Sequence, residues 1–162
     1  MEKQSMDQER SRPIRRGRME FRSKLVEGVG AFIYSKTTDR YLFLLRTGGS
    51  WPMTWALPGG KIIPGETPFQ GLAREIEEEL GGRISDPKLV LLDYYVSKNE
   101  KFRYTTYFVS VDVEFVPLLN DEHIGYAWLP LAAAPKPLHP GISRTLADTE
   151  IINKINSAKS SN

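Results

Sequence analysis

The chain contains no cysteine and only two histidines. Without cysteine it can form no disulfide framework, no thiolate zinc site and no cysteine nucleophile. No run approaches the roughly 18 apolar residues that a membrane span needs, and the polar N-terminus lacks the apolar core of a signal peptide. We therefore expect a cytoplasmic protein with no membrane partner. Its 162 residues fit one domain with a hydrophobic core.

Charge is unevenly distributed along the chain, although the net charge is only +2. Residues 1–24 hold eight basic and four acidic residues, whereas the remainder holds 14 basic and 16 acidic ones. A basic arm before a slightly acidic domain could contact RNA or nucleotide phosphates. Because this segment has no apolar periodicity, a flexible, solvated arm over residues 1–23 is the simpler interpretation.

Strand-like and helix-like segments alternate irregularly after this arm. Two β-rich pairs, each joined by a polar turn, predict hairpins, and a short apolar strand and a helix follow. The segments are 24–35 with 40–46, 88–97 with 102–117, the strand at 126–130 and the helix at 142–156. This order favours an α+β fold over a regular βαβ succession.

A helix is predicted between Thr67 and Gly81. Thr67 suits the N-cap and forms a capping box with Gln70, Pro68 suits the first helical position, and Gly81 ends the helix. An amphipathic stripe with helical spacing marks the face expected to be buried: Phe69, Leu72, Ala73, Ile76 and Leu80.

The same helix carries a dense group of carboxylates. Glu75, Glu78 and Glu79 fall within an arc of about 100° beside the apolar stripe, whereas Glu77 points elsewhere. Such a group is usually a solvated face, but clustered carboxylates repel one another unless a cation gathers them. Mg²⁺ takes oxygen ligands of this kind, together with water and substrate phosphates.

The spacing of these residues resembles the Nudix hydrolase family. Its signature, Gly-x5-Glu-x7-Arg-Glu-U-x-Glu-Glu-x-Gly-U with U a bulky aliphatic residue, is matched except at the last position, which is Gly82. The matching residues are Gly60, Glu66, Arg74, Glu75, Ile76, Glu78, Glu79 and Gly81. The hairpin at 24–46, the "WALPGG" segment before the signature and the helix at 142–156 also resemble the family, so the resemblance spans residues 24–157. Residues 158–162 are expected to form a disordered tail.

The resemblance implies a mixed β-sheet sandwiched between helices and hydrolysis of a nucleoside diphosphate linked to another moiety, with Mg²⁺ or Mn²⁺. It implies that the Gly60 carbonyl, Glu75, Glu78 and Glu79 hold the metal. Arg74 would orient the glutamates, and Glu66 would pair with Arg74 or act near the metal. The carboxylate that takes a proton from the attacking water could be Glu79, Glu75 or Glu122, the last on the loop before the short strand.

Substrate contacts are less marked in the sequence. Trp51, in a Gly/Ser/Pro loop, is the best candidate to stack on a nucleobase, and Arg46 and Lys61 could contact phosphates. His123 and His139 are expected to be surface or structural residues. Nucleotide sugars and ADP-ribose are slightly favoured over nucleoside triphosphates. The alternatives are an RNA 5′-end pyrophosphohydrolase and a catalytically idle nucleotide- or RNA-binding module. In each case the protein is expected to be a monomer or a homodimer.

Overall fold

Strand β1 (Val26–Ser35) lies at the centre of the fold and pairs with three other strands. The computed structural model describes residues 24–85 and 87–161, so the N-terminal arm predicted over 1–23 lies outside the described residues. After β1 the elements are β2 (Arg40–Arg46), β3 (Trp55–Ala56), β4 (Gly59–Lys61), α1 (Pro68–Leu80), β5 (Val90–Val96), β6 (Phe102–Val111), β7 (His123–Leu129), the 3₁₀ turn η1 (Leu131–Ala133), α2 (Pro140–Ala147) and α3 (Thr149–Ser160).

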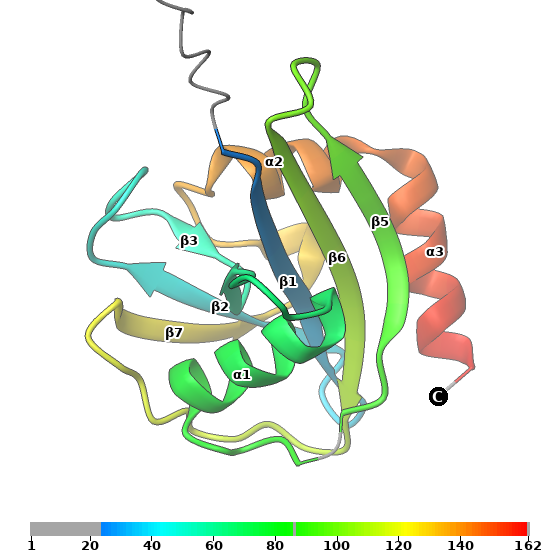
Figure 1. Ribbon diagram of the computed structural model, residues 1–162. Coiled ribbons are helices and arrows are strands. Elements are labelled where there is room, and N and C mark those ends of the chain that lie inside the picture. The colour runs from blue at the N-terminus through cyan, green and yellow to red at the C-terminus, as the bar shows by residue number, and fades with distance from the viewer. Residues whose placement is uncertain (1–23, 86, 162) are drawn as a thin grey trace, which may run out of the picture.

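These elements form the α+β architecture that the sequence predicts, a mixed sheet between helices. The strand order is β3-β2-β1-β6-β5, with β4 paired to β1 and β7 paired to β2. Helix α1 covers one face, and α2 and α3 lie against the other (Figure 1). Within the described residues, no helix has the length and apolar content needed to cross a membrane.

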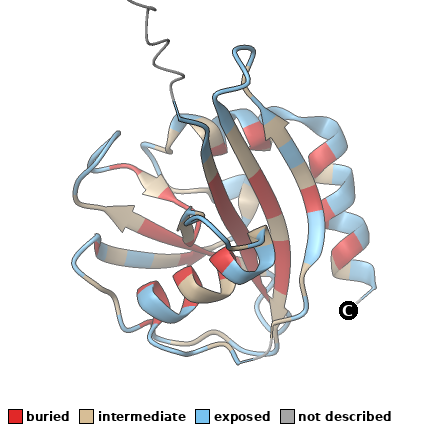
Figure 2. Ribbon diagram, viewed as in Figure 1, coloured by how far each residue is buried: buried red, intermediate tan, exposed pale blue. Residues whose placement is uncertain are grey.

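Two apolar clusters fill the space on either side of β1. Val29, Ala31 and Ile33 point toward α1, where they pack with Leu72 and Ile76. On the opposite face, Phe32 and Tyr34 pack with Phe108 and with Ile151 and Ile155 of α3. Because both faces of β1 are covered, its sequence is a nearly continuous apolar run, and buried residues follow β1 and β6 through the molecule (Figure 2).

The edge of β1 that faces β2 is shared between two partners. β1 pairs with β2 only at Tyr34↔Tyr41 and Ser35↔Arg40, and then with β4 from Gly28 to Gly30. On its other edge β1 pairs in parallel with β6 over ten residues. β2 is therefore free to diverge from β1 and to pair with β3 and β7 instead. Residues 55–61 cross the resulting gap, which we call the seam.

Several predicted boundaries differ from the structure. The strand predicted at 126–130 is β7 from His123 to Leu129, because its pairing with β2 extends to Arg46. β6 ends at Val111 and not at 117, because its partner β1 ends at Ser35, opposite Val111. The helix predicted over 142–156 is two helices, because Asp148 is extended and its carboxylate accepts from the N–H groups of Glu150 and Ile151, which caps α3. α3 then continues to Ser160, past the limit at 157, and Ala158 is buried.

Helix α1 begins with the predicted capping box. Thr67 accepts from the Gln70 N–H, the Gln70 side chain accepts from the Thr67 N–H, and Gly81 ends the helix in a left-handed conformation. The buried stripe is narrower than predicted, because Phe69 is 48% exposed. Gly82, where the signature has an aliphatic residue, is also left-handed with φ 69°, a conformation that a branched side chain strains.

Removing the capping hydroxyl should destabilise the protein without altering the site. Thr67→Ala leaves an N–H of the first turn without its acceptor, so we expect the free energy of unfolding to fall by about 1 kcal/mol. Urea denaturation followed by circular dichroism measures this change. An unchanged midpoint would show that α1 is held by packing alone.

Candidate functional site

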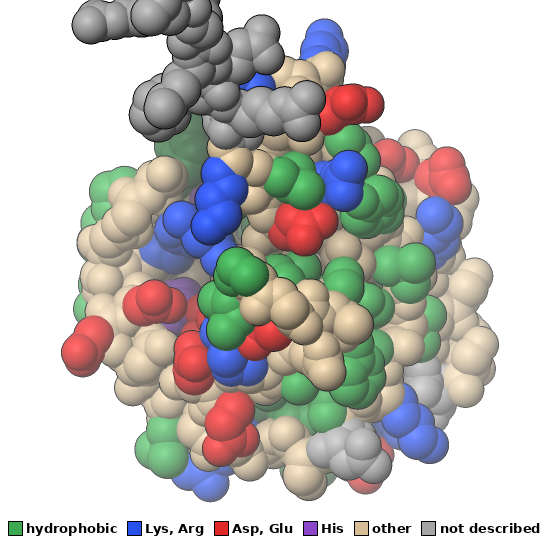
Figure 3. Space-filling model, in the orientation of Figure 1, with side chains coloured by type: hydrophobic (Ala, Val, Ile, Leu, Met, Phe, Trp, Pro, Cys, Tyr) green, Lys and Arg blue, Asp and Glu red, His purple; other side chains and the backbone are tan. Residues whose placement is uncertain are grey.

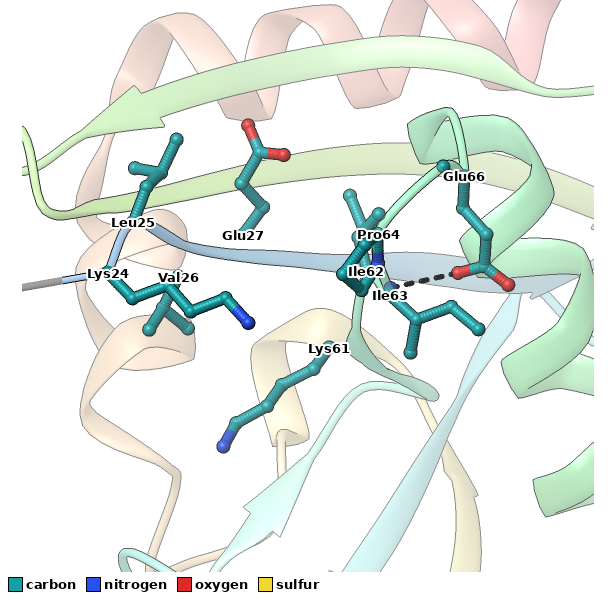
Figure 4. A pocket seen from close by; sticks show the side chains of 10 residues that line it. Lys24, Leu25, Val26, Glu27, Lys61, Ile62, Ile63, Pro64 and Glu66 are labelled. Atoms are coloured by element: carbon teal, nitrogen blue, oxygen red, sulfur yellow. Dashed lines mark hydrogen bonds between the residues drawn. The ribbon is translucent and has the colours of Figure 1, made fainter.

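The Arg74 guanidinium organises the carboxylates of the signature. Its Nε and Nη2 donate to the two Glu66 oxygens at 2.7 and 3.1 Å, and Nη1 donates to Glu75 at 2.8 Å and to Glu78 at 3.3 Å. Nη2 also donates to the Lys61 carbonyl at 2.8 Å, which joins α1 to β4. Glu66 in turn accepts from the Ile63 N–H (Figure 4). The Arg74 hydrogen bond lowers the pKa of Glu66, so this carboxylate is charged and links the loop at Ile63 to Arg74 of α1.

Glu79 is the most deeply buried carboxylate of the group, at 1% exposure. Its Oε2 accepts from the Gly59 N–H at 2.7 Å, which attaches α1 to the segment that crosses the seam. Burial raises the pKa of Glu79 to about 9, and the nearby Glu75 and Glu122 act in the same direction, whereas Arg46 opposes them. Without a cation, the carboxyl is therefore protonated at neutral pH.

Glu75 lies directly against the backbone at Gly60. A Cβ atom on Gly60 would lie 2.5 Å from the Glu75 carboxyl carbon, so a side chain here would displace this carboxylate. Burial raises the pKa of Glu75, and the ion pair with Arg74 opposes this rise. The predicted ligands Gly60 and Glu75 therefore lie together. Glu78 instead points to solvent and contacts Arg74.

A second group of side chains approaches Glu79 from across the seam. Glu122 and His123, at the start of β7, each bring one ligand atom to within 4.8 Å of each other and of a Glu79 oxygen. The Thr47 N–H donates to the Glu122 carbonyl, and His123 pairs with Arg46 in the β2–β7 ladder. The distance from His123 Nδ1 to Glu79 Oε1 is 3.7 Å.

His123 is buried and neutral in this position. Burial and the positive charge of Arg46 lower the pKa of His123 to about 4. Among the described residues, Nδ1 has no hydrogen-bond partner. The sequence predicts a surface or structural histidine here, whereas the structure buries His123 beside Glu79 through the β2–β7 register.

The three predicted substrate contacts occupy different places. Arg46 ends β2 beside the carboxylates, and its charge acts on both Glu79 and His123. Trp51 is 57% exposed on the loop between β2 and β3, with its backbone in the left-handed region. Lys61 lines a groove of about 370 Å³ between the start of β1 and the 61–66 loop, and its amine points away from Glu66 (Figure 4).

The site lies on the face of the molecule that carries α1. Figure 3 shows acidic, basic and histidine side chains gathered there, next to the α1 carboxylates. The structure thus brings together Gly60, Arg74, Glu75, Glu79 and Glu122 from the sequence prediction, with Arg46 beside them and Glu66 bound to Arg74. It places the buried Glu79 carboxyl near further carboxylates and the Arg46 guanidinium, groups that can bind a metal ion and phosphate oxygens.

Comparison with known proteins places the chain in a family. The model of the NUDIX domain matches residues 24–149. A nucleoside triphosphatase NudI from Escherichia fergusonii is 28% identical over 76% of this chain and 90% of its own length. An 8-oxo-dGTP diphosphatase from Haemophilus influenzae is 31% identical over 60% of this chain and 65% of its own length.

A solved structure shares the fold at lower sequence identity. The NUDIX domain of Shewanella oneidensis NrtR, crystallised with ADP ribose, superposes with a TM-score of 0.67 at 17% identity, over 83% of this chain and 90% of that one. With the family model covering most of its length, the chain belongs to the NUDIX family and is a Nudix-type pyrophosphohydrolase.

The burial of Glu79 should make the metal-free protein lose stability as pH rises. With a folded pKa of about 9 against an ordinary 4.5, the folded state holds this proton more tightly than the unfolded chain does. The contribution of Glu79 to folding stability is therefore complete below the pKa of the unfolded chain and is lost as pH rises through the pKa of the folded state. Glu79→Gln should therefore flatten the fall in Tm between about pH 5.5 and about pH 8.5, measured with chelator.

The exposed Glu77, two residues earlier on α1, provides the matched control. Glu77→Gln should leave the pH dependence of Tm as in the wild type. Equal slopes for wild type and Glu79→Gln would mean that Glu79 is ionised in the metal-free fold.

Proposed function

We propose that this enzyme hydrolyses a pyrophosphate bond of a nucleoside triphosphate in a reaction that depends on a divalent cation held by Glu79. The observation that carries the proposal is the meeting of ligand atoms from Glu79, Glu122 and His123 within 4.8 Å, on a chain that matches the Nudix signature at every position but the last. The buried Glu79 carboxyl favours a bound cation, because a cation is the partner that makes its ionised form stable.

The donor set fits a divalent cation. Glu79 and Glu122 would hold it, and the predicted ligands Gly60 and Glu75 lie at the Glu79 side of the site. Such an ion supplies charge neutralisation of the phosphates and a lower pKa for the attacking water. Glu78 stays a predicted ligand, and Mg²⁺ stays the predicted ion, with Mn²⁺ as its substitute.

The remaining side chains bind, position and transfer protons. Arg46 contacts a phosphate oxygen, because its charge already faces the carboxylates from the end of β2. Glu75 accepts the proton of the attacking water, since burial raises its pKa and makes it a stronger base than an exposed carboxylate. Arg74 is a positioning residue that holds Glu75 through Nη1.

Substrate class rests on the relatives and on the exposed aromatic loop. This chain matches 90% of the length of the relative from Escherichia fergusonii, which is named a nucleoside triphosphatase. This supports nucleoside triphosphates over the nucleotide sugars and ADP-ribose that the sequence slightly favours. Trp51 would stack on the base, because its side chain is exposed on the loop that follows Arg46.

A substrate panel with Glu79→Gln as the blank tests the reaction. The panel holds ordinary and oxidised nucleoside triphosphates, ADP-ribose, nucleotide sugars and 5′-triphosphorylated RNA, with products resolved by chromatography. We expect one triphosphate to be preferred and its turnover to fall at least about a hundredfold in Glu79→Gln, because the main metal ligand loses its charge. Glu77→Gln should retain wild-type turnover.

Other outcomes of the panel overturn defined parts of the proposal. Preference for ADP-ribose or a nucleotide sugar would overturn the substrate class and keep the reaction. Preference for RNA, lost when residues 1–22 are removed, would assign the arm a role in binding. If folded, metal-loaded protein turned over no member of the panel, the result would favour the catalytically idle nucleotide- or RNA-binding module.

The role of Glu75 can be separated from that of Glu122. Glu75→Gln should lower kcat by about 10²–10⁴-fold and remove the acidic limb of the pH–rate profile, because the proton acceptor is lost. Glu122→Gln should instead raise the metal concentration needed for half-maximal rate. The opposite pattern would assign proton transfer to Glu122.

A further inference from the structure

We propose that His123 is itself a metal ligand through Nδ1, and that this nitrogen makes the site select a first-row transition ion such as Mn²⁺ over Mg²⁺. The inference rests on the proposed function in placing a cation at Glu79. It goes further in naming a ligand outside the Nudix signature and the consequence of that ligand for metal choice.

The first argument is the unsatisfied nitrogen. The His123 side chain is 5% exposed, and its Nδ1 lacks a hydrogen-bond partner among the described residues. A buried polar atom without a partner is costly and calls for an explanation, and a bound ion is one that also accounts for the neighbouring carboxylates. The facing Glu79 Oε1 is 3.7 Å away, which is too long for a hydrogen bond.

The second argument is the spacing of the donors. Two donors that each lie about 2.2 Å from a common ion can be at most about 4.4 Å apart. The 3.7 Å between His123 Nδ1 and Glu79 Oε1 lies inside this limit. The exposed Glu122, the third member of the group within 4.8 Å, can turn toward the same point.

The third argument is that the fold fixes both donors before any ion binds. His123 is held in the ladder opposite Arg46, and the Glu79 carboxylate is held by the Gly59 N–H. Arg46 lies on the β2 side, where it can meet the phosphates.

A nitrogen donor changes the preferred ion. Mg²⁺ binds oxygen and gives up its waters reluctantly, whereas first-row transition ions accept imidazole readily. A site of two carboxylates and one imidazole should therefore bind Mn²⁺ more tightly than Mg²⁺. Losing the imidazole should reduce that difference.

Pulsed electron paramagnetic resonance of bound Mn²⁺ tests the ligand directly. Tag-free protein in an amine-free buffer, with one equivalent of Mn²⁺ and no substrate, should show modulation from a coordinated ¹⁴N. Growth with ¹⁵N-histidine should convert this signal to the ¹⁵N pattern without any mutation. The chain has only two histidines, so His123→Gln should abolish the signal and His139→Gln should keep it.

Metal affinity provides the second readout. In His123→Gln, shown to be folded by circular dichroism, Mn²⁺ affinity should fall about tenfold or more, while Mg²⁺ affinity changes much less. Absence of nitrogen modulation in the wild type, or its persistence in His123→Gln, overturns the proposal. Equal losses for both ions overturn the metal preference.

The outcomes also separate this inference from the proposed function. Metal-dependent triphosphate hydrolysis that requires Glu79, without a coordinated nitrogen, would keep the reaction and overturn the histidine ligand. A coordinated His123 nitrogen in protein that turns over no member of the panel would keep the ligand and overturn the reaction.

Discussion

The fold around the site depends on one buried interaction, the hydrogen bond from the Gly59 N–H to the Glu79 carboxyl. It joins the last turn of α1 to the segment that crosses between β2 and β1. Burying a carboxyl at 1% exposure is costly unless it is hydrogen-bonded, and the Gly59 N–H offsets part of this cost. The fold accepts this local cost because Leu72, Ile76 and Leu80 bury the rest of the helix face.

The signature residues divide into those that build the site and those that face it. Arg74 and Glu66 form the frame, since their hydrogen bonds join the helix to the loop and to the Lys61 carbonyl. Gly60 belongs to the frame because it leaves space for Glu75. Glu79 and Glu75 are the members turned inward. The dense glutamates of α1 therefore have different surroundings, which their closeness along the sequence conceals.

Local features were predictable from the sequence and long-range ones were not. The capping box at Thr67 and the helix end at Gly81 follow from rules that act within a few residues. The exposure of Phe69 and the start of α3 at Asp148 depend on where tertiary partners lie. The approach of His123 to Glu79 was not predictable, because it depends on the β2–β7 register, which shifts between Leu45 and Arg46.

The seam along β1 has a consequence for how the site can move. Glu79 is attached to the half of the sheet built on β1, β4 and β6, through its hydrogen bond with Gly59. Arg46, Glu122 and His123 belong to the half built on β2 and β7. The two halves share only two paired positions between β1 and β2, at Tyr34 and Ser35. A change in the angle between the halves would alter the separation of Glu79 and His123. The apolar cluster that Leu44, Trp128 and Leu80 share across the seam resists such a change.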